Sequence, residues 1–397
     1  ASSAASDVYK RQVLLTNILN PFRIFFYDKL RDEYAHHNVD FRVLVMVPNE
    51  PGRTWQYDDF RRDYTTLMKG GLKKVSGIDV IINPGIGRVI KKMNPDVMVC
   101  AGSYMLPSVW AAIGLKKKCN YKVFYWSESH LNEKRSYGSL KLAVRSFFRN
   151  TVISRFDGFW YAGKMSKEFI DTYASEDSYY VFVPNLIDER AYYIASKYSE
   201  EQKKVIRKSY NVADDNVMFL TPARLSKEKG ILEFLDIMNN VPSKNKVTIV
   251  MPGQGELKEE IEKKAKEYGI DLRLVGFKKQ TDMIDLYGAT DVFVLPSLSD
   301  PNPLSCIEAC WSANPLIVSE HVGNNPEIIT EGQNGYVISY KNSKKAVNDI
   351  EQMICSSDEW KKNAGLFSLK VAQEKFNSER VVARVAKETL AIWENVK

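Results

Sequence analysis

Short apolar runs alternate with helical segments along almost the whole chain, and this alternation is broken once, near Pro184 and Asn185. An apolar run of four to six residues is typical of a buried strand, and strands alternating with helices predict parallel sheets. Before the break, the predicted strands are Val13–Thr16, Phe41–Val47, Val97–Ala101, Lys122–Trp126 and Phe159–Ala162. After the break, they are Met218–Thr221, Val247–Met251, Leu272–Val275, Val292–Leu295, Leu316–Val318 and Tyr336–Ile338.

Two such series separated by a linker predict an α/β protein of two facing Rossmann-like domains with a cleft between them. The length of 397 residues agrees with two or three domains. We place the N-terminal domain at residues 13–185 and the C-terminal domain at residues 186–375. A final helical stretch follows at residues 376–397.

The first twelve residues, ASSAASDVYKRQ, do not fit this pattern. They lack the apolar core of a signal peptide, and they do not resemble the start of a strand. We expect residues 1–12 to be a non-native or disordered leader without function.

The charge of the chain is unevenly distributed. Residues 13–185 contain 25 Lys and Arg against 17 Asp and Glu, whereas residues 186–397 contain 29 against 31. The N-terminal domain is therefore the one expected to contact an anionic partner. No apolar run is long enough to span a membrane, and five scattered cysteines indicate free thiols rather than a disulfide framework.

The densest basic stretch is Lys134–Arg155, which contains six basic residues and no acidic ones. Such a stretch with apolar residues between the charges suits an anionic membrane surface. A core helix with a solvated basic edge explains it equally simply. Nucleic acid is not an expected partner, because no binding module is recognisable.

Arg224 and Lys229 lie in TPARLSKEKG, between a predicted strand and the next helix. A guanidinium and an ammonium at such a position suit a diphosphate. Pairs at this spacing are also common on solvated surfaces, so the spacing alone is weak support.

The segment 291–308, DVFVLPSLSDPNPLSCIE, predicts a strand, a loop and a helix. Asn302 is suited to cap that helix and Pro303 to begin it, which would leave the amides of Leu304 and Ser305 available to an anion. Asp300 and Glu308 could accept hydrogen bonds from sugar and ribose hydroxyls, or serve only as a turn residue and a helix support.

Other polar features are less specific. PGQGEL at residues 252–257 is a strand-to-helix glycine turn in which Gly253 permits close approach of a ligand. Cys306 and Cys310 lie one helical turn apart without further ligand residues, so we expect them in the core. We find no spacing typical of a metal site.

Taken in order, these motifs resemble a known family. The run PARLSKEKG, MPGQGEL, VGF, LPSLSDPNPLSCIEA, NPLIVSEHVGNNPEII and GQNGYVI is similar to the donor half of retaining glycosyltransferases of the GT-B fold, family 4, also called glycosyl transferases group 1. The similarity covers about residues 180–345. NPFRIFFYDKL, NPDVMVCAGSY, FYWSES and YAGKMSKEF in the first half resemble one branch of that family.

The resemblance implies roles for individual residues of the second half. Arg224 and Lys229 match the pair that holds the nucleotide diphosphate, and Glu308 matches the second acid of an E-x7-E motif, which binds the ribose. Asp300 stands where the family usually has a glutamate that contacts the donor sugar. Gly253 and Phe277 fall near the donor and its base, and Asn302, Pro303, Leu304 and Ser305 are expected to line the donor site.

In the first half, the resemblance implies an acceptor site. The loop after the first strand lacks the glycines common in the family, and we assign Asn20 and Arg23 to the acceptor side. Ser103 and His130 are assigned there as well. We favour Glu128 over His130 as the catalytic residue of this half. The resemblance also implies that helix 376–397 packs back on the N-terminal domain.

The implied function is a hexosyltransferase-type glycosyltransferase that moves a sugar from a nucleotide-sugar to a glycan or lipid-linked acceptor, with retention and without a metal or other cofactor. Bacterial surface polysaccharide assembly is the expected process. The expected location is the cytoplasm or the inner face of the cytoplasmic membrane. A nucleotide-sugar epimerase and a non-catalytic binding protein of the same fold remain alternatives.

Overall fold

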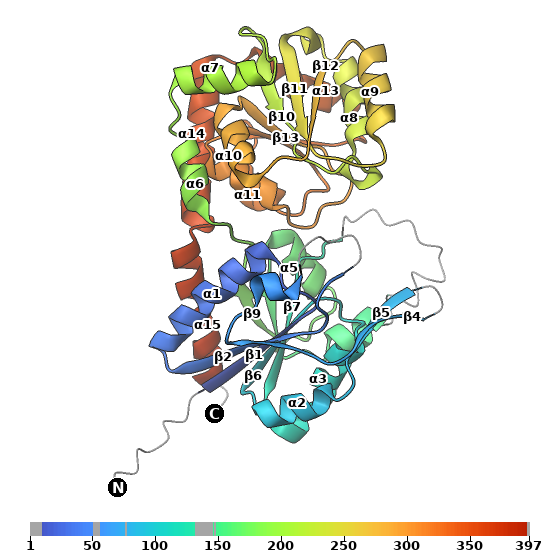
Figure 1. Ribbon diagram of the computed structural model, residues 1–397, viewed down its shortest axis with the longest axis vertical. Coiled ribbons are helices and arrows are strands. Elements are labelled where there is room, and N and C mark those ends of the chain that lie inside the picture. The colour runs from blue at the N-terminus through green and yellow to red at the C-terminus, as the bar shows by residue number, and fades with distance from the viewer. Residues whose placement is uncertain (1–9, 51–55, 76–77, 132–145, 147, 395–397) are drawn as a thin grey trace.

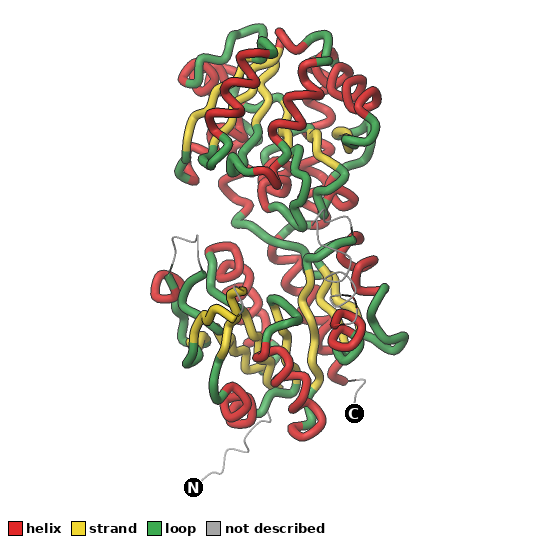
Figure 2. The backbone as a smooth tube through the Cα atoms, turned by 90° about the vertical axis from the view of Figure 1, so that its right-hand side faces the viewer, coloured by secondary structure: helices red, strands yellow, loops and turns green. Residues whose placement is uncertain are grey.

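The computed structural model describes residues 10–50, 56–75, 78–131, 146 and 148–394, and contains two parallel sheets stacked along the long axis of the molecule (Figure 1). The first sheet has seven strands in the order β3-β2-β1-β6-β7-β8-β9, and the second has six in the order β12-β11-β10-β13-β14-β15. Helices cover both sheets, as the view turned by 90° also shows (Figure 2). The predicted fold class, two Rossmann-like domains, is confirmed.

The N-terminal domain is built from short buried strands joined by crossover helices. Its sheet strands are β1 (Lys10–Thr16), β2 (Val39–Val45), β3 (Thr65–Leu67), β6 (Val97–Ala101), β7 (Lys122–Ser127), β8 (Gly158–Tyr161) and β9 (Tyr179–Phe182). A separate antiparallel pair consists of β4 (Gly71–Val75) and β5 (Ile78–Ile82). The helices are α1 (Pro21–His36), α2 (Ile86–Met93), α3 (Pro107–Cys119) and α5 (Lys164–Asp171), with a 3-10 turn at Tyr57–Phe60.

The C-terminal domain repeats this plan. Its strands are β10 (Val217–Leu220), β11 (Val247–Pro252), β12 (Asp271–Gly276), β13 (Val292–Leu295), β14 (Leu316–Ser319) and β15 (Gly335–Ile338). The helices are α6 (Glu189–Ala195), α7 (Glu200–Ser209), α8 (Ile231–Asn239), α9 (Lys258–Glu267), α10 (Gln280–Ala289), α11 (Leu304–Trp311), α12 (Asn325–Ile328), α13 (Ser343–Cys355), α14 (Asp358–Lys375) and α15 (Ser378–Glu394). Short 3-10 turns lie at Lys227–Lys229 and Lys244–Lys246.

The prediction of a leader at residues 1–12 is wrong for its last three residues. The strand β1 begins at Lys10 and pairs with β2 from there. Gln12 is fully buried and accepts a hydrogen bond of 2.9 Å from the hydroxyl of Tyr34. A polar side chain with a buried partner can continue a strand, which the apolar pattern alone did not reveal. Residues 1–9 lie outside the described part of the chain.

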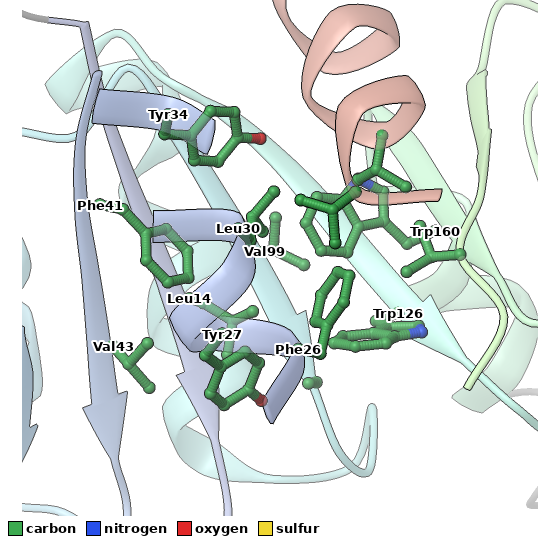
Figure 3. Close-up of a cluster of buried hydrophobic side chains, with 14 of the residues drawn as sticks. Leu14, Phe26, Tyr27, Leu30, Tyr34, Phe41, Val43, Val99, Trp126 and Trp160 are labelled. Atoms are coloured by element: carbon green, nitrogen blue, oxygen red, sulfur yellow. The ribbon is translucent and has the colours of Figure 1, made fainter. Parts of the chain in front are cut away.

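Helix α15 packs against α1 of the N-terminal domain, beside the aromatic core of that domain (Figure 3). Trp393 stacks on Tyr34 with ring centroids 6.4 Å apart, and Arg384 lies over the ring of Phe182. The chain therefore returns to its first domain after completing the second, as the long helices at the left of Figure 1 show. No helix within the described residues is both long and apolar enough to span a membrane.

The two domains contact each other through loops that follow the carboxyl ends of their strands. The backbone N–H of Lys164, in the first turn of α5, donates a 2.7 Å hydrogen bond to the carboxylate of Glu327 from α12. Asn185 donates to the carbonyl of Asn302 at 3.1 Å. Glu327 thus caps a helix of the opposite domain, where a negative charge is favoured by the helix dipole.

We predict that this interdomain cap makes stability depend on pH. Burial raises the pKa of Glu327, while the Lys164 N–H lowers it less. The folded protein therefore binds this proton more tightly than the unfolded chain, and the contribution of Glu327 to stability falls as pH rises through its folded pKa. Glu327→Gln keeps an acceptor for the Lys164 N–H but does not titrate.

The unfolding free energy of Glu327→Gln relative to the wild type should accordingly rise as the pH increases from about 4.5, the ordinary value for a glutamate, through the raised pKa of Glu327 in the folded state, as measured by urea denaturation. Glu374→Gln, which changes an exposed carboxylate on α14, is the matched control and should show no such trend. An identical pH dependence of the two variants would contradict the prediction.

Candidate active site

The side chains of Lys229 and Asp300 form an ion pair at the carboxyl edge of the C-terminal sheet, with Nζ and Oδ2 2.7 Å apart. Lys229 ends the 3-10 turn after β10, and Asp300 lies in the loop after β13. Both side chains are mostly buried, at 18% and 14% exposure. The strands β10 and β13 are neighbours, so parallel pairing brings together residues that are 71 positions apart.

The backbone holds this pair in place. The amides of Leu298 and Ser299 both donate to the carbonyl of Glu228, at 2.8 Å and 3.2 Å. The amide of Asp300 donates to the carbonyl of His321, and its carbonyl accepts from Gly323 at 2.8 Å. The loop that carries Asp300 is thus fixed on two sides by neighbouring loops.

Arg224 lies near this pair in the sequence but has a different partner. Its guanidinium contacts Glu228 at 3.1 Å, and its side chain is 74% exposed. An ion pair this exposed contributes little to stability, about 0–1 kcal/mol. Arg224 can therefore exchange Glu228 for another anion at small cost.

Glu308, on α11, is held by two tyrosines that the sequence analysis did not identify. The hydroxyl of Tyr192 donates to Oε1 at 2.9 Å, and that of Tyr287 donates to Oε2 at 2.7 Å. Burial raises the pKa of Glu308, while the two hydroxyls oppose that rise. Tyr192 comes from α6, directly after the linker, and only the fold brings it to α11.

The start of α11 differs from the prediction. The helix begins at Leu304 with Pro303 in the capping position, so the prediction that Asn302 caps it is wrong. The backbone of Asn302 serves the domain contact with Asn185 instead. Both polar atoms of its buried side chain lack a hydrogen-bond partner within the described residues. Ser305 and Leu304 lie in the first turn.

A pocket of about 290 Å³ lies beside the glycine turn after β11. It is lined by Leu225, Gly253, Gln254, Gly255, Lys258, Leu274 and Gly276. Gly253 has a φ of +149°, and a Cβ there would approach the carbonyl oxygen of Ala223 to 1.8 Å, so only glycine fits. Phe277 follows the pocket residue Gly276 and is 76% exposed.

The predicted acceptor residues lie at the carboxyl edge of the N-terminal sheet. The guanidinium of Arg23 forms an ion pair with Glu128 and lies 3.7 Å from the ring centroid of Trp126. The Trp126 ring also contacts Phe26 in the aromatic core. Asn20 caps α1 by accepting a 2.9 Å bond from the Arg23 amide. Ser103 is exposed after β6.

His130 lies at the interface between the domains. It is 3% exposed, and its ring approaches Gly323, whose backbone supports Asp300. The structure therefore separates the predicted residues into two groups. Lys229, Asp300 and Glu308 belong to the C-terminal domain, and Arg23 and Glu128 belong to the N-terminal domain, with His130 at the contact.

The remaining predictions concern cysteines, metals and the basic stretch. Cys306 and Cys310 are fully buried in the core of the C-terminal domain, as predicted, and all five cysteines are free. Among the described residues, no group of three or more His, Cys, Asp or Glu is arranged to hold a metal ion. Of Lys134–Arg155, residues 134–145 and 147 lie outside the described residues.

Residues 202–365 match the family Glycosyl transferases group 1. The chain carries a domain of this family. The matched segment contains Arg224, Lys229, Asp300 and Glu308. It therefore assigns the ion pair and the tyrosine-bound carboxylate to a glycosyltransferase domain, while the retaining mechanism and the subfamily stay predictions.

Curated relatives align with only part of the chain. An uncharacterized glycosyltransferase of Methanocaldococcus jannaschii is 29% identical over 158 residues, which is 39% of this chain and 40% of the relative. A UDP-Gal:alpha-D-GlcNAc-diphosphoundecaprenol alpha-1,3-galactosyltransferase of Escherichia coli is 27% identical over 176 residues, 43% of this chain and 42% of the relative. The alignments thus span less than half of each relative.

Solved structures extend the likeness to the whole fold. The crystal structure of the Anabaena protein HepE in complex with UDP and glucose aligns with a TM-score of 0.70 at 15% identity, over 97% of this chain and 100% of HepE. At this low identity, the structural likeness shows a shared fold of two Rossmann-like domains and nothing finer.

We predict that Gly230 is required for the close packing of the turn after Lys229 against the loop that begins at Pro296. It has a φ of +64°, and a Cβ there would lie 2.3 Å from the carbonyl oxygen of Pro296. Gly269 has a similar φ of +62° with nothing within 4 Å. Both alanine variants carry the backbone strain, of order 1 kcal/mol, but only Gly230→Ala adds the clash.

Gly230→Ala should therefore lower the melting temperature of the C-terminal domain by several degrees more than Gly269→Ala, at about 2–4 °C per kcal/mol for a domain of this size. Differential scanning calorimetry measures the two shifts. Equal shifts would show that the contact with Pro296 is unimportant.

Proposed function

We propose that this protein is a retaining glycosyltransferase of family 4, which transfers a sugar from a nucleoside diphosphate sugar to a hydroxyl group of an acceptor. The observation that carries the proposal is the buried Lys229–Asp300 ion pair within the matched glycosyltransferase segment. A cation and a carboxylate in contact suit a ligand that has a diphosphate next to a polyhydroxylated sugar.

The proposed chemistry follows from charge. Breaking the bond between the anomeric carbon and phosphate oxygen places negative charge on the diphosphate. Lys229 and the exposed guanidinium of Arg224 stabilise that charge, which is electrostatic catalysis. The ammonium of Lys229 has three donors, so it can serve a phosphate oxygen while it keeps Asp300. The carboxylate of Asp300 then accepts hydrogen bonds from sugar hydroxyls.

Two further features support a donor site in this domain. The amides at the start of α11 and the unpartnered side chain of Asn302 offer donors to a phosphate. Glu308, held by its two tyrosines, has the acceptor oxygens that a ribose diol requires. We assign the base to the pocket beside Gly253 and to Phe277. UDP is the first nucleotide to test, because HepE was solved with it.

For the acceptor we propose a glycan or lipid-linked saccharide of bacterial polysaccharide assembly. The support is the name of the Escherichia coli relative, which specifies a diphosphoundecaprenol-linked acceptor, and the basic balance of residues 13–185. We assign Arg23 and Glu128 to this site. In this proposal the carboxylate of Glu128, which pairs with Arg23, is the group that approaches the acceptor hydroxyl.

The decisive test is nucleotide binding by isothermal titration calorimetry with UDP. Lys229→Ala removes the buried cation and should weaken UDP binding by about tenfold or more, the effect of a charged hydrogen bond of roughly 1.5–3 kcal/mol. Lys227→Ala removes an exposed lysine from the same turn and is the matched control, with unchanged affinity.

Equal affinity of Lys229→Ala and the wild type would contradict the donor site. UDP binding without transfer to any saccharide acceptor would favour the non-catalytic alternative. Interconversion of UDP-sugars without an acceptor would favour the epimerase.

We also predict that transfer does not require a metal ion, because Lys229 and Arg224 supply the positive charge that a divalent cation would otherwise bring. Turnover after EDTA treatment should stay within about twofold of the untreated rate. Restoration of lost activity by added magnesium or manganese would contradict this prediction.

A further inference from the structure

We propose that Tyr340 is a positioning residue that sets the Lys229–Asp300 contact by joining the two loops on which these residues lie. Tyr340 follows β15, and its partly buried ring packs against the core of the C-terminal domain. Its hydroxyl donates to the carbonyl of Pro296 and lies 3.4 Å from the carbonyl of Gly230. The role in transfer rests on the proposed function, whereas the role in geometry does not.

The two carbonyls contacted by Tyr340 belong to the two loops of the site. Gly230 directly follows Lys229, and Pro296 begins the loop that leads to Asp300. The Tyr340 hydroxyl therefore touches both loops within a few residues of the ion pair. No part of the proposed donor chemistry uses this hydroxyl directly.

The other contacts between the loops show what Tyr340 adds. On one side of the ion pair, the amides of Leu298 and Ser299 donate to the carbonyl of Glu228. On the other side, Gly230 packs against the carbonyl of Pro296, where Tyr340 also binds. The two loops are thus joined by a backbone contact before Lys229 and by a contact that includes one side-chain hydroxyl after it, while backbone bonds with His321 and Gly323 hold Asp300 itself.

Removing that hydroxyl has a local cost. The carbonyl of Gly230 also accepts from Phe234 in the first turn of α8, so it keeps a partner. The carbonyl of Pro296 would lose the hydrogen bond from Tyr340 in a protected position, and such a group tends to move towards another donor or water. Movement of Pro296 shifts the loop that carries Asp300 and lengthens the contact with Lys229.

The first experiment measures this geometry without any ligand. The rate at which an amine-reactive reagent modifies Lys229 is followed by mass spectrometry in the wild type, Tyr340→Phe and Tyr336→Phe. Tyr336 lies on β15 in the same core and is the matched control. Phenylalanine retains the packed ring in both variants, and their melting temperatures confirm the fold.

Lys229 should react about fivefold faster in Tyr340→Phe than in the wild type, the factor expected from one lost hydrogen bond, and at the wild-type rate in Tyr336→Phe. An unchanged rate in a folded Tyr340→Phe protein would overturn the proposal. Equal acceleration in both variants would also overturn it, because the effect would then reflect general loosening of the core.

The second experiment separates the proposal from the proposed function. UDP should protect Lys229 of the wild type from the reagent, and UDP should bind Tyr340→Phe about fivefold more weakly by calorimetry. If UDP neither binds nor protects, the donor site is contradicted, while the labelling rates alone still decide the role of Tyr340. If UDP binds both proteins equally and Lys229 labels equally, Tyr340 has no positioning role.

Discussion

Both sheets are parallel throughout, and parallel pairing means that every strand ends at the same edge. Residues that follow β10, β13, β14 and β15 therefore meet, although more than a hundred positions separate the first from the last. The Lys229–Asp300 pair, its supporting backbone bonds and the Tyr340 hydroxyl all lie at this edge. The chemistry of the site depends on this convergence more than on any single residue.

The same constraint acts between the domains. Loops after β8 and β14 bring the Lys164 amide to the Glu327 carboxylate, and the linker residue Asn185 reaches the carbonyl next to α11. Asn302 thereby takes part in both the domain contact and the edge of the proposed donor site. A change in the relative position of the domains would therefore move Asn302 and alter the contacts at the start of α11, which lies at the proposed donor site.

The two ion pairs of the proposed donor site differ in their exposure and therefore in how easily a ligand can separate them. Arg224 and Glu228 are exposed and easily separated, which suits a cation that must reach a ligand. Lys229 and Asp300 are mostly buried, so separating them would leave a charge with poor solvation. A ligand is therefore expected to join this pair rather than replace it. The buried carboxylate of Glu308 is stabilised in a different way. The hydroxyls of Tyr192 and Tyr287 donate neutral hydrogen bonds to it, in place of a cation.

The fold class could be predicted from the order of residues alone, because short apolar strands and amphipathic helices are local patterns of burial. The sequence also singled out Lys229, Asp300 and Glu308, because motifs record residue types in order. It misjudged Gln12 and Asn302, whose roles depend on Tyr34 and Asn185, far away in the chain. The folded chain was needed to show that Lys229 pairs with Asp300, that Tyr192 and Tyr287 hold Glu308, and that the hydroxyl of Tyr340 contacts both loops. A hydrogen bond between distant segments leaves no periodic pattern in the sequence of either segment, whereas the burial of one face of a strand or helix does.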